Sequence, residues 1–237
     1  MKRLLLLSNS TNFGQGYLDH ASVEIRALFA GLTRIAFVPF ALQDQAAYAD
    51  KARARFEREG IALDPVTPDA RGRELVASAA GVFVGGGNTF RLLDRLQRTG
   101  ILVVLRDRAL AGMPYLGASA GANIAAPSIK TTNDMPIVAP PSFEALGLLG
   151  FQVNPHYVDA ELGSIHMGET REDRLREYLE ENLAPVLGLR EGAWLEVLGE
   201  ATTLGGANGA KLFRRGQQPL EIAPRSRLDV LLASADR

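Results

Sequence analysis

Cysteine is absent from the 237-residue chain. This absence excludes disulfide bonds, metal sites built on thiolates and a cysteine nucleophile. Any covalent catalysis by this protein must therefore use a different side chain as its nucleophile.

Long apolar runs and a large net charge are also missing. The leucines at residues 4–7 stop at Ser8, so the run is too short for the core of a signal peptide, and no run approaches the ~20 residues of a membrane helix. The formal net charge of -1 gives no overall attraction to nucleic acid or to an anionic membrane. We therefore expect a cytoplasmic protein without a nucleic-acid or membrane partner. Monomer and homodimer are both left open.

The chain alternates short apolar runs with amphipathic stretches. Its hydrophobic content of 46% is enough to bury a sizeable core. The alternation predicts a mostly parallel sheet covered by helices on both faces, in one α/β domain over residues 1–237. Strands are expected at residues 4–7, 35–40, 61–66, 81–84, 113–117 and 148–156 and just before Glu191, and helices at residues 17–32, 43–59, 69–79, 90–98 and 102–111.

Ser119 stands between Gly117 and Gly121, with the GxSxG spacing of a nucleophile elbow. At such an elbow the chain leaves a strand, turns sharply at the serine and enters a helix, so its neighbours must be small. The serine oxygen is then exposed above the sheet, and the N–H of Ala120 can stabilise an oxyanion. The same spacing also fits a structural turn with no catalytic role.

A triple glycine, residues 85–87, directly follows another expected strand. It lacks the GxGxxG spacing of a dinucleotide site and the Lys-Ser/Thr pair of a Walker loop, which argues against nucleotide binding. The carboxyl ends of parallel strands meet at one edge of the sheet, so this loop should lie near Ser119. The N–H of Gly87 is then a second candidate oxyanion donor, and a tight turn is the alternative reading.

A nucleophilic serine needs a general base, and the chain has three histidines. His20 lies on an expected helix and His166 among small and polar residues in a loop. His156 ends an expected strand, so we expect it to reach Ser119 at the same sheet edge. His156 is therefore the candidate base.

A carboxylate is needed to orient the imidazole and to stabilise its protonated form. Glu191 follows an apolar strand and precedes a glycine, which places it at the working edge of the sheet. Asp134 lies in the polar loop at residues 127–138 and could fold over the serine. The sequence leaves both carboxylates open as the third member of a triad.

Taken together, these motifs resemble those of the peptidase E family. These enzymes are α-aspartyl dipeptidases in a serine peptidase family that also includes the cyanophycinases. The resemblance covers most of the chain up to about Phe213. The matching segments are residues 4–11, 84–90, 117–123, 131–138, 154–156, 168–171 and 191–192.

The resemblance implies a three-layer fold like that of class I glutamine amidotransferases. Those enzymes carry cysteine at the elbow, so Ser119 argues against amidotransferase chemistry here. By resemblance Ser119 is the nucleophile and His156 the base. Glu191 stands at the position of the family's third member, and Asp134 at a position also proposed for that role.

The resemblance further implies hydrolysis of dipeptides whose first residue is aspartate with a free amine, without a metal or organic cofactor. Arg171 is the candidate ligand for the aspartyl carboxylate, because a guanidinium forms two parallel charge-assisted hydrogen bonds. Asn88 is a further candidate substrate-binding residue, and Asp134 or Glu169 could bind the amine. The alternatives are a cyanophycinase-like hydrolase of aspartyl-arginine units and a non-catalytic protein that binds small ligands.

Overall fold

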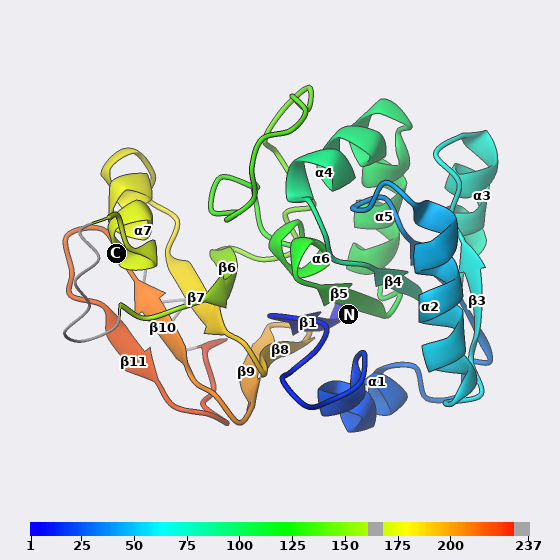
Figure 1. Cartoon of the computed structure of the whole chain (residues 1–237), viewed down its shortest axis with the longest axis horizontal. Helices are drawn as coiled ribbons and strands as arrows, with labels where there is room; N and C mark the ends of the chain where they lie inside the picture. Colours follow the sequence, from blue (N-terminus) through cyan, green and yellow to red (C-terminus); the bar gives the residue numbers. More distant parts are fainter. Residues whose placement is uncertain (161–167, 230–237) are drawn as a thin grey trace.

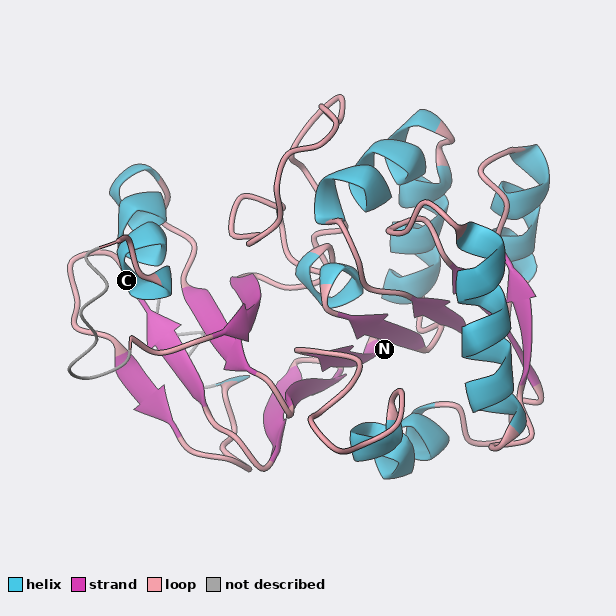
Figure 2. Ribbon diagram, viewed as in Figure 1, coloured by secondary structure: helices cyan, strands magenta, loops and turns pink. Residues whose placement is uncertain are grey.

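A seven-stranded sheet forms the centre of the larger part of the molecule (Figures 1 and 2). The computed structural model describes residues 1–160 and 168–229, and the strands and helices below are those of these ranges. Five neighbouring strands run parallel, and the last two join antiparallel at one edge. The order is β3 (Ala62–Pro65), β2 (Arg34–Val38), β4 (Val82–Val84), β5 (Tyr115–Ala118), β1 (Arg3–Leu7), β8 (Ala193–Leu198) and β9 (Ala201–Gly206).

Both faces of this sheet are buried, as the alternation of side chains along a strand requires. In β1, Leu4 and Leu6 belong to one apolar cluster, whereas Leu5 and Leu7 belong to a second cluster on the opposite face. Helices cover both faces, so the sheet is the middle layer of three (Figure 1). None of the helices within the described ranges is long and apolar enough to cross a membrane.

The helices divide between the two faces. Those that contribute to the second cluster are α1 and α2, and those that contribute to the first are α3, α4, α5 and α6. Asp44 and Asp69 cap two of these helices by accepting hydrogen bonds from backbone N–H groups of the first turn. The bounds are α1 (Ser22–Leu28), α2 (Gln45–Glu57), α3 (Ala70–Ser78), α4 (Thr89–Arg98), α5 (Ile101–Leu110) and the short α6 (Ala120–Asn123).

A separate four-stranded sheet lies beside the larger one (Figure 2). Leu175 and Leu179 on the inner side of its helix, α7, pack with Tyr157, Val186 and Phe213 from its strands. The order is β11 (Leu220–Ile222), β10 (Ala210–Phe213), β7 (Val186–Arg190) and β6 (Gln152–Tyr157), with α7 at Arg171–Glu181.

The α/β class with a mostly parallel central sheet is confirmed, but two expectations were wrong. The helix expected at residues 17–32 is only a 3-10 turn, Asp19–Ala21, followed by α1, because Leu18 has a left-handed backbone with φ 60°. The strand that carries His156 does not lie at the edge of the parallel sheet. It belongs to the four-stranded sheet, as does β7, the strand before Glu191, so both residues approach the serine from the second sheet.

Candidate active site

Ser119 occupies the sharp turn between β5 and α6, where its backbone has φ 54° and ψ -110°. A side chain at Gly121 would overlap the carbonyl oxygen of Val84, and one at Gly117 would overlap the carbonyl of Gly121. The Ser119 N–H donates to the Leu7 carbonyl at 2.9 Å. The GxSxG spacing is therefore required by close packing of the backbone around a strained serine.

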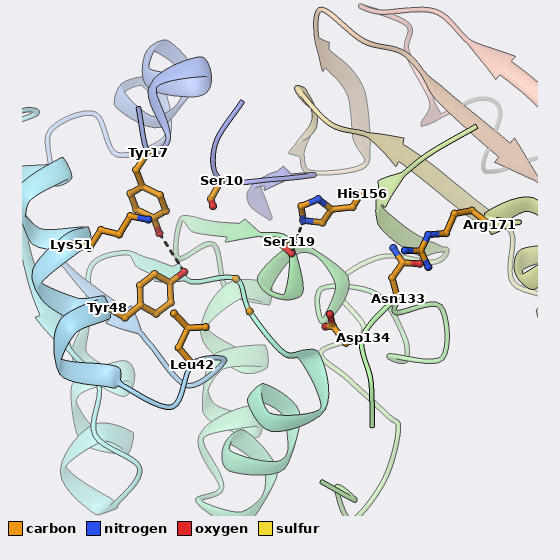
Figure 3. A pocket seen from close by; sticks show the side chains of 12 residues that line it. Ser10, Tyr17, Leu42, Tyr48, Lys51, Ser119, Asn133, Asp134, His156 and Arg171 are labelled. Atoms are coloured by element: carbon orange, nitrogen blue, oxygen red, sulfur yellow. Dashed lines mark hydrogen bonds between the residues drawn. The ribbon is translucent and has the colours of Figure 1, made fainter. Parts of the chain in front are cut away.

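A chain of hydrogen bonds runs from Ser119 through His156 to Glu191. His156 Nε2 lies 2.9 Å from Ser119 Oγ, and His156 Nδ1 lies 2.6 Å from Glu191 Oε1. Figure 3 shows the first of these contacts at the centre of the site. The imidazole and carboxylate side chains are 40% and 57% exposed, so this part of the site is open to solvent. The order nucleophile, imidazole, carboxylate is that of a serine hydrolase triad.

His156 is held in an unusual backbone conformation, with φ 53°, inside β6. The pairing of β6 with β7 is irregular between Asn154 and Tyr157, and this irregularity takes His156 out of the regular hydrogen bonding between the two strands. The His156 N–H instead donates to Ser8 Oγ at 2.9 Å, and Ser8 Oγ donates to the Leu189 carbonyl at 2.7 Å. The Ser8 side chain is fully buried, so this hydroxyl joins the end of β1 to both β6 and β7.

Glu191 lies in the turn between β7 and β8. The N–H of Gly192, which has φ 78°, donates to Asn9 Oδ1 at 2.8 Å. Asn208 Nδ2 donates to the Glu191 carbonyl at 2.6 Å. The turn that presents the Glu191 carboxylate is therefore fixed on both sides by asparagine side chains.

Asp134, the other candidate carboxylate, has different partners. Its Oδ2 accepts hydrogen bonds from Thr89 N at 2.7 Å, from Thr89 Oγ1 at 2.6 Å and from Thr132 Oγ1 at 3.2 Å. These contacts place its negative charge at the N-terminus of α4, where the helix dipole stabilises it. The same side chain also lines the cavity described below. The structure thus brings Glu191, and not Asp134, to the His156 ring.

The triple glycine lies against the elbow. A side chain at Gly85 would collide with the Tyr48 hydroxyl, and one at Gly86 would come within 2.9 Å of Ser119 Cβ. Gly87 has φ 133°, a conformation that other residues rarely adopt. Glycine is therefore required at position 85 by the close approach of Tyr48, at position 86 by the close approach of Ser119, and at position 87 by this backbone conformation.

Asn88 caps α4 and does not line the cavity beside Ser119. Its Oδ1 accepts from Arg91 N at 3.0 Å, and its Nδ2 donates to the Met135 carbonyl at 2.8 Å. Both ends of the amide are therefore engaged in holding the loop to the helix. This placement does not support the expectation that Asn88 binds substrate.

A cavity of about 540 Å³ opens above Ser119 (Figure 3). Lys51 and Tyr17 lie on one side of the serine, and Arg171 lies on the other. Both sheets and the loops between them contribute to its walls. The lining residues are Ser10, Tyr17, Leu42, Tyr48, Lys51, Gly86, Gly87, Ser119, Asn133, Asp134, His156 and Arg171.

Arg171 is the first residue of α7 and directs its guanidinium into this cavity. Within residues 1–160 and 168–229 it makes no hydrogen bond or ion pair, although the nearby Asp134 attracts it. Burial and the neighbouring Arg174 lower the pKa of Arg171. A guanidinium always carries its charge in proteins, so Arg171 presents a positive charge to the cavity.

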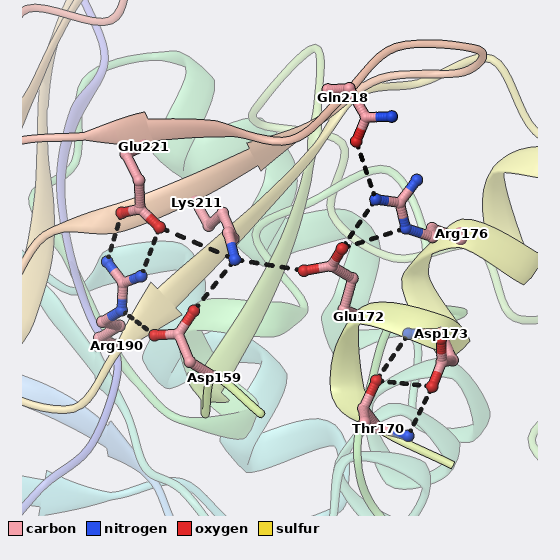
Figure 4. Close-up of polar contacts among 9 residues, drawn as sticks. All are labelled: Asp159, Thr170, Glu172, Asp173, Arg176, Arg190, Lys211, Gln218 and Glu221. Carbon is pink, nitrogen blue, oxygen red and sulfur yellow. Dashed lines mark hydrogen bonds and ion pairs between the residues drawn. The ribbon is translucent and has the colours of Figure 1, made fainter. Parts of the chain in front are cut away.

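An ionic network fixes the start of α7 to the four-stranded sheet (Figure 4). Lys211 Nζ on β10 lies 3.2 Å from Glu172 on the helix and 3.2 Å from Asp159. Arg190 pairs with Asp159 at 2.7 Å and with Glu221 at 2.9 Å. Hydrogen bonds from Arg190 and Lys211 hold the pKa of Asp159 below its usual range. The network therefore anchors the helix turn that carries Arg171.

The sequence profile of peptidase family S51 matches residues 4–205. This chain belongs to peptidase family S51. It is 54% identical over 229 residues to peptidase E of Streptomyces coelicolor, covering 97% of this chain and 94% of that protein. It is 44% identical over 234 residues to a probable alpha-aspartyl dipeptidase of Drosophila melanogaster, covering 98% of each.

Solved structures have the same S51-type fold. A putative peptidase E from Listeria monocytogenes superposes with a TM-score of 0.67 at 22% identity, covering 88% of this chain and all of that one. A peptidase from an acI-B1 actinobacterium gives a TM-score of 0.71 at 16% identity, covering 96% of each chain. At these identities the likeness concerns the fold alone.

Sequence reasoning gave no specific role to several residues of this S51 site. Ser8 and Asn9 belong to the segment at residues 4–11 that resembles the family, and the structure shows that they position the histidine and the Glu191 turn. Tyr48 and Lys51 lie three residues apart on α2, and only the packing of that helix beside the glycine loop brings them to the cavity.

Of the other two histidines of this chain, only His20 lies within the described residues, and it is not part of this hydrogen-bonded group. His20 lies in the turn before α1, near Trp194, and neither of its ring nitrogens has a hydrogen-bond partner within the described residues. Burial lowers the pKa of His20. His166 falls outside the described residues.

Proposed function

We propose that this S51 member is a serine dipeptidase that hydrolyses dipeptides with an N-terminal aspartate through an acyl-enzyme on Ser119. The observation that carries the proposal is the hydrogen-bonded series of Ser119, His156 and Glu191 beside a cavity that Arg171 also lines. The printed names of the relatives, peptidase E and probable alpha-aspartyl dipeptidase, support the same activity.

In the first step His156 Nε2 takes the proton of Ser119 Oγ as this oxygen attacks the scissile carbonyl. Glu191 accepts a hydrogen bond from Nδ1–H, which fixes the tautomer and stabilises the imidazolium that forms. The 2.6 Å contact between these groups supports Glu191 as the third member. Asp134, whose hydrogen bonds go to Thr89 and Thr132, is then free for another role.

The tetrahedral intermediate carries a negative oxygen that needs donors in place before the reaction. We assign this task to the N–H groups of Gly87, which lines the same cavity as Ser119, and of Ala120, the first residue of α6. A single oxyanion donor is typically worth about 3 kcal/mol of the barrier. Both donors are main-chain groups, so the backbone conformation at φ 133° for Gly87 is part of the catalytic arrangement.

Collapse of the intermediate breaks the C–N bond, and His156 gives its proton to the leaving amine. The second amino acid departs, and an aspartyl ester remains on Ser119. A water molecule then attacks this ester, loses its proton to His156 and displaces the serine oxygen, which takes the proton back. The products are aspartate and the free second amino acid, and the residues named here need no cofactor for these steps.

The substrate aspartate presents a side-chain carboxylate and a free amine. We assign the carboxylate to Arg171, whose guanidinium matches it with two parallel hydrogen bonds. We assign the amine to Asp134, which lines the cavity. Glu169, the alternative for the amine, instead accepts from Arg174 at 2.6 Å and is not among the lining residues.

The test is turnover of a panel of X-Leu and Asp-X dipeptides by the wild-type protein and by Arg171→Ala. We expect the variant to lose about 100- to 1,000-fold in kcat/KM on Asp-Leu, because a charged hydrogen-bonded pair contributes about 3–4 kcal/mol. Arg171→Lys should recover only part of this loss, since an ammonium keeps the charge but not the fork. Equal wild-type rates on Asp-Leu and Ala-Leu would contradict an aspartate-selective site.

Two controls complete the panel. Arg98→Ala removes an exposed arginine that pairs with Asp94 on α4, and should leave every rate unchanged. N-blocked Asp-Leu should be a poor substrate if the amine is bound. Cleavage of an aspartyl-arginine polymer in preference to dipeptides would favour a cyanophycinase-like enzyme, and no hydrolysis at all would favour a binding protein. Cytoplasmic location and a monomeric or homodimeric state stay predictions from the sequence.

A further inference from the structure

Lys51 is a second cation without an ionic partner in the cavity. It is an exposed residue of α2, and its Nζ lies 4.5 Å from the centre of the Tyr17 ring. In the part of the chain that the structure describes, it makes no salt bridge, whereas Arg53, two residues along the same helix, pairs with Asp50. Figure 3 places Lys51 across Ser119 from Arg171.

The groups around Lys51 do not balance its charge. Tyr17 and Tyr48 face it from the cavity wall and are hydrogen bonded to each other, with 3.3 Å between their hydroxyl oxygens. Burial raises the pKa of both tyrosines, so both remain neutral phenols at physiological pH. Leu42 adds an apolar surface at this end of the cavity. Among the described residues that line the cavity, the end that faces away from Arg171 therefore has a positive charge and no carboxylate.

We propose that Lys51 binds the free C-terminal carboxylate of the residue that leaves during hydrolysis. This inference rests on the proposed function, because it assigns the part of the substrate that Arg171 and Asp134 leave unmatched. An aspartyl dipeptide has a side-chain carboxylate, an amine and a terminal carboxylate. The cavity offers Arg171, Asp134 and Lys51 in its lining, so each charge of the substrate has a group of opposite sign.

The direction in which a dipeptide extends from Ser119 supports this assignment. Two extended residues span about 7 Å, so a scissile carbonyl at Ser119 places the terminal carboxylate one residue away from it. That direction is opposite to the aspartyl side, and Lys51 lies on this opposite side of Ser119 (Figure 3). In a longer peptide an uncharged amide would stand where the dipeptide has its carboxylate.

The chemistry of lysine suits a leaving group of variable side chain. Its ammonium is a point charge on a flexible stem, so it can follow a carboxylate whose position shifts with the second residue. The ammonium also selects the carboxylate by its charge rather than by its shape. Lys51 would thus restrict the enzyme to dipeptides without fixing which residue follows the aspartate.

The experiment compares Asp-Leu with Asp-Leu-amide, which differ only in the terminal charge. Wild-type protein should prefer Asp-Leu by about 2- to 5-fold in kcat/KM, the range expected for one exposed ion pair. Lys51→Met should lose this factor on Asp-Leu and keep the wild-type rate on the amide, so the preference disappears. Lys51→Arg should retain most of it. Arg53→Met is the matched control on the same helix and should behave as wild type.

The outcomes separate this inference from the function on which it rests. Turnover of Asp-Leu with the same preference in wild type and Lys51→Met would overturn the role of Lys51 and leave the dipeptidase intact. Equal loss on both substrates would also overturn it, because the charge of the carboxylate would then be irrelevant. Failure of wild-type protein to hydrolyse any aspartyl dipeptide would overturn the proposed function, and this inference with it.

Discussion

The two sheets contribute to the active site in different ways. The seven-stranded sheet supplies Ser119 and the glycine loop, whose positions are set by close backbone packing in a buried region. The four-stranded sheet supplies His156, and the turn after β7 supplies Glu191, with side chains 40% and 57% exposed. Ser8 and Asn9, directly after β1, connect the two by accepting hydrogen bonds from the N–H groups of His156 and Gly192.

Because of this difference, we expect substitutions near the two sheets to have different effects, on stability in one case and on catalysis in the other. A substitution in the closely packed region around Ser119 and the glycine loop should mainly lower the free energy of unfolding, because the surrounding backbone cannot move without disturbing the core. A substitution of the more exposed His156 or Glu191 should mainly lower the rate of hydrolysis, because few buried contacts are lost. Variants in the two halves can test this division directly.

Gly121→Ala should have the largest effect. Its new methyl group would meet the Val84 carbonyl in the buried strand beside the elbow, and we expect a loss of about 3 kcal/mol or more in the free energy of unfolding. Urea unfolding measures this loss. Gly150→Ala, at a glycine with open space around it, is the control and should unfold like wild type. A fully stable Gly121→Ala would contradict the steric account of the elbow.

Glu191→Gln should leave stability nearly unchanged and lower kcat on Asp-Leu by about 100- to 1,000-fold, since the amide no longer stabilises the imidazolium. Asp134→Asn should act mainly on KM, by about 10-fold, if Asp134 binds the substrate amine. Steady-state kinetics of both variants separates these roles. A larger fall in kcat for Asp134→Asn than for Glu191→Gln would transfer the catalytic role to Asp134.

Ser8→Ala should show an intermediate effect on both properties. The variant leaves the His156 N–H without its acceptor, which costs about 1–3 kcal/mol of stability, and it releases the histidine from its strained backbone. We expect kcat to fall by about 10- to 100-fold while KM changes little. Ser78→Ala, an exposed serine on α3, serves as the control. Unchanged kcat in Ser8→Ala would show that the cross-sheet hydrogen bond does not position the base.

His20→Phe should have the smallest effect, and only on the pH dependence of stability. The folded chain lowers the pKa of His20, so the unfolded chain binds the proton first as the pH falls through its ordinary value of about 6.5. Wild-type protein therefore loses some stability below this pH. The variant should lose less, as measured by melting temperature at about pH 7 and about pH 5. Its activity should equal that of wild type, whereas His156→Gln should be inactive.

The local features of this site could be predicted from the sequence. The elbow at Ser119 and the triple glycine are short motifs whose geometry follows from the absence of bulky side chains. The alternating apolar runs were sufficient to predict the parallel part of the large sheet. His156 could be chosen as the candidate base because it follows an apolar run, although its strand belongs to the other sheet.

The long-range features could not be predicted. Ser8 and His156 are 148 residues apart in the chain, and no periodic pattern encodes their contact. The same holds for Lys51, which reaches the cavity from α2, whereas the family resemblance did single out Arg171 at the start of α7. The choice between Glu191 and Asp134 also depended on which loop folds against the imidazole, which a single sequence does not specify.

The most direct test of the central claim is to detect the acyl-enzyme. The protein is mixed with a chromogenic aspartyl anilide, quenched in acid at early times and digested for mass spectrometry. We expect the peptide that contains Ser119 to gain the mass of one aspartyl residue, and Ser119→Ala to show neither this adduct nor turnover. Turnover by Ser119→Ala at the wild-type rate, or an adduct on a different residue, would contradict the account.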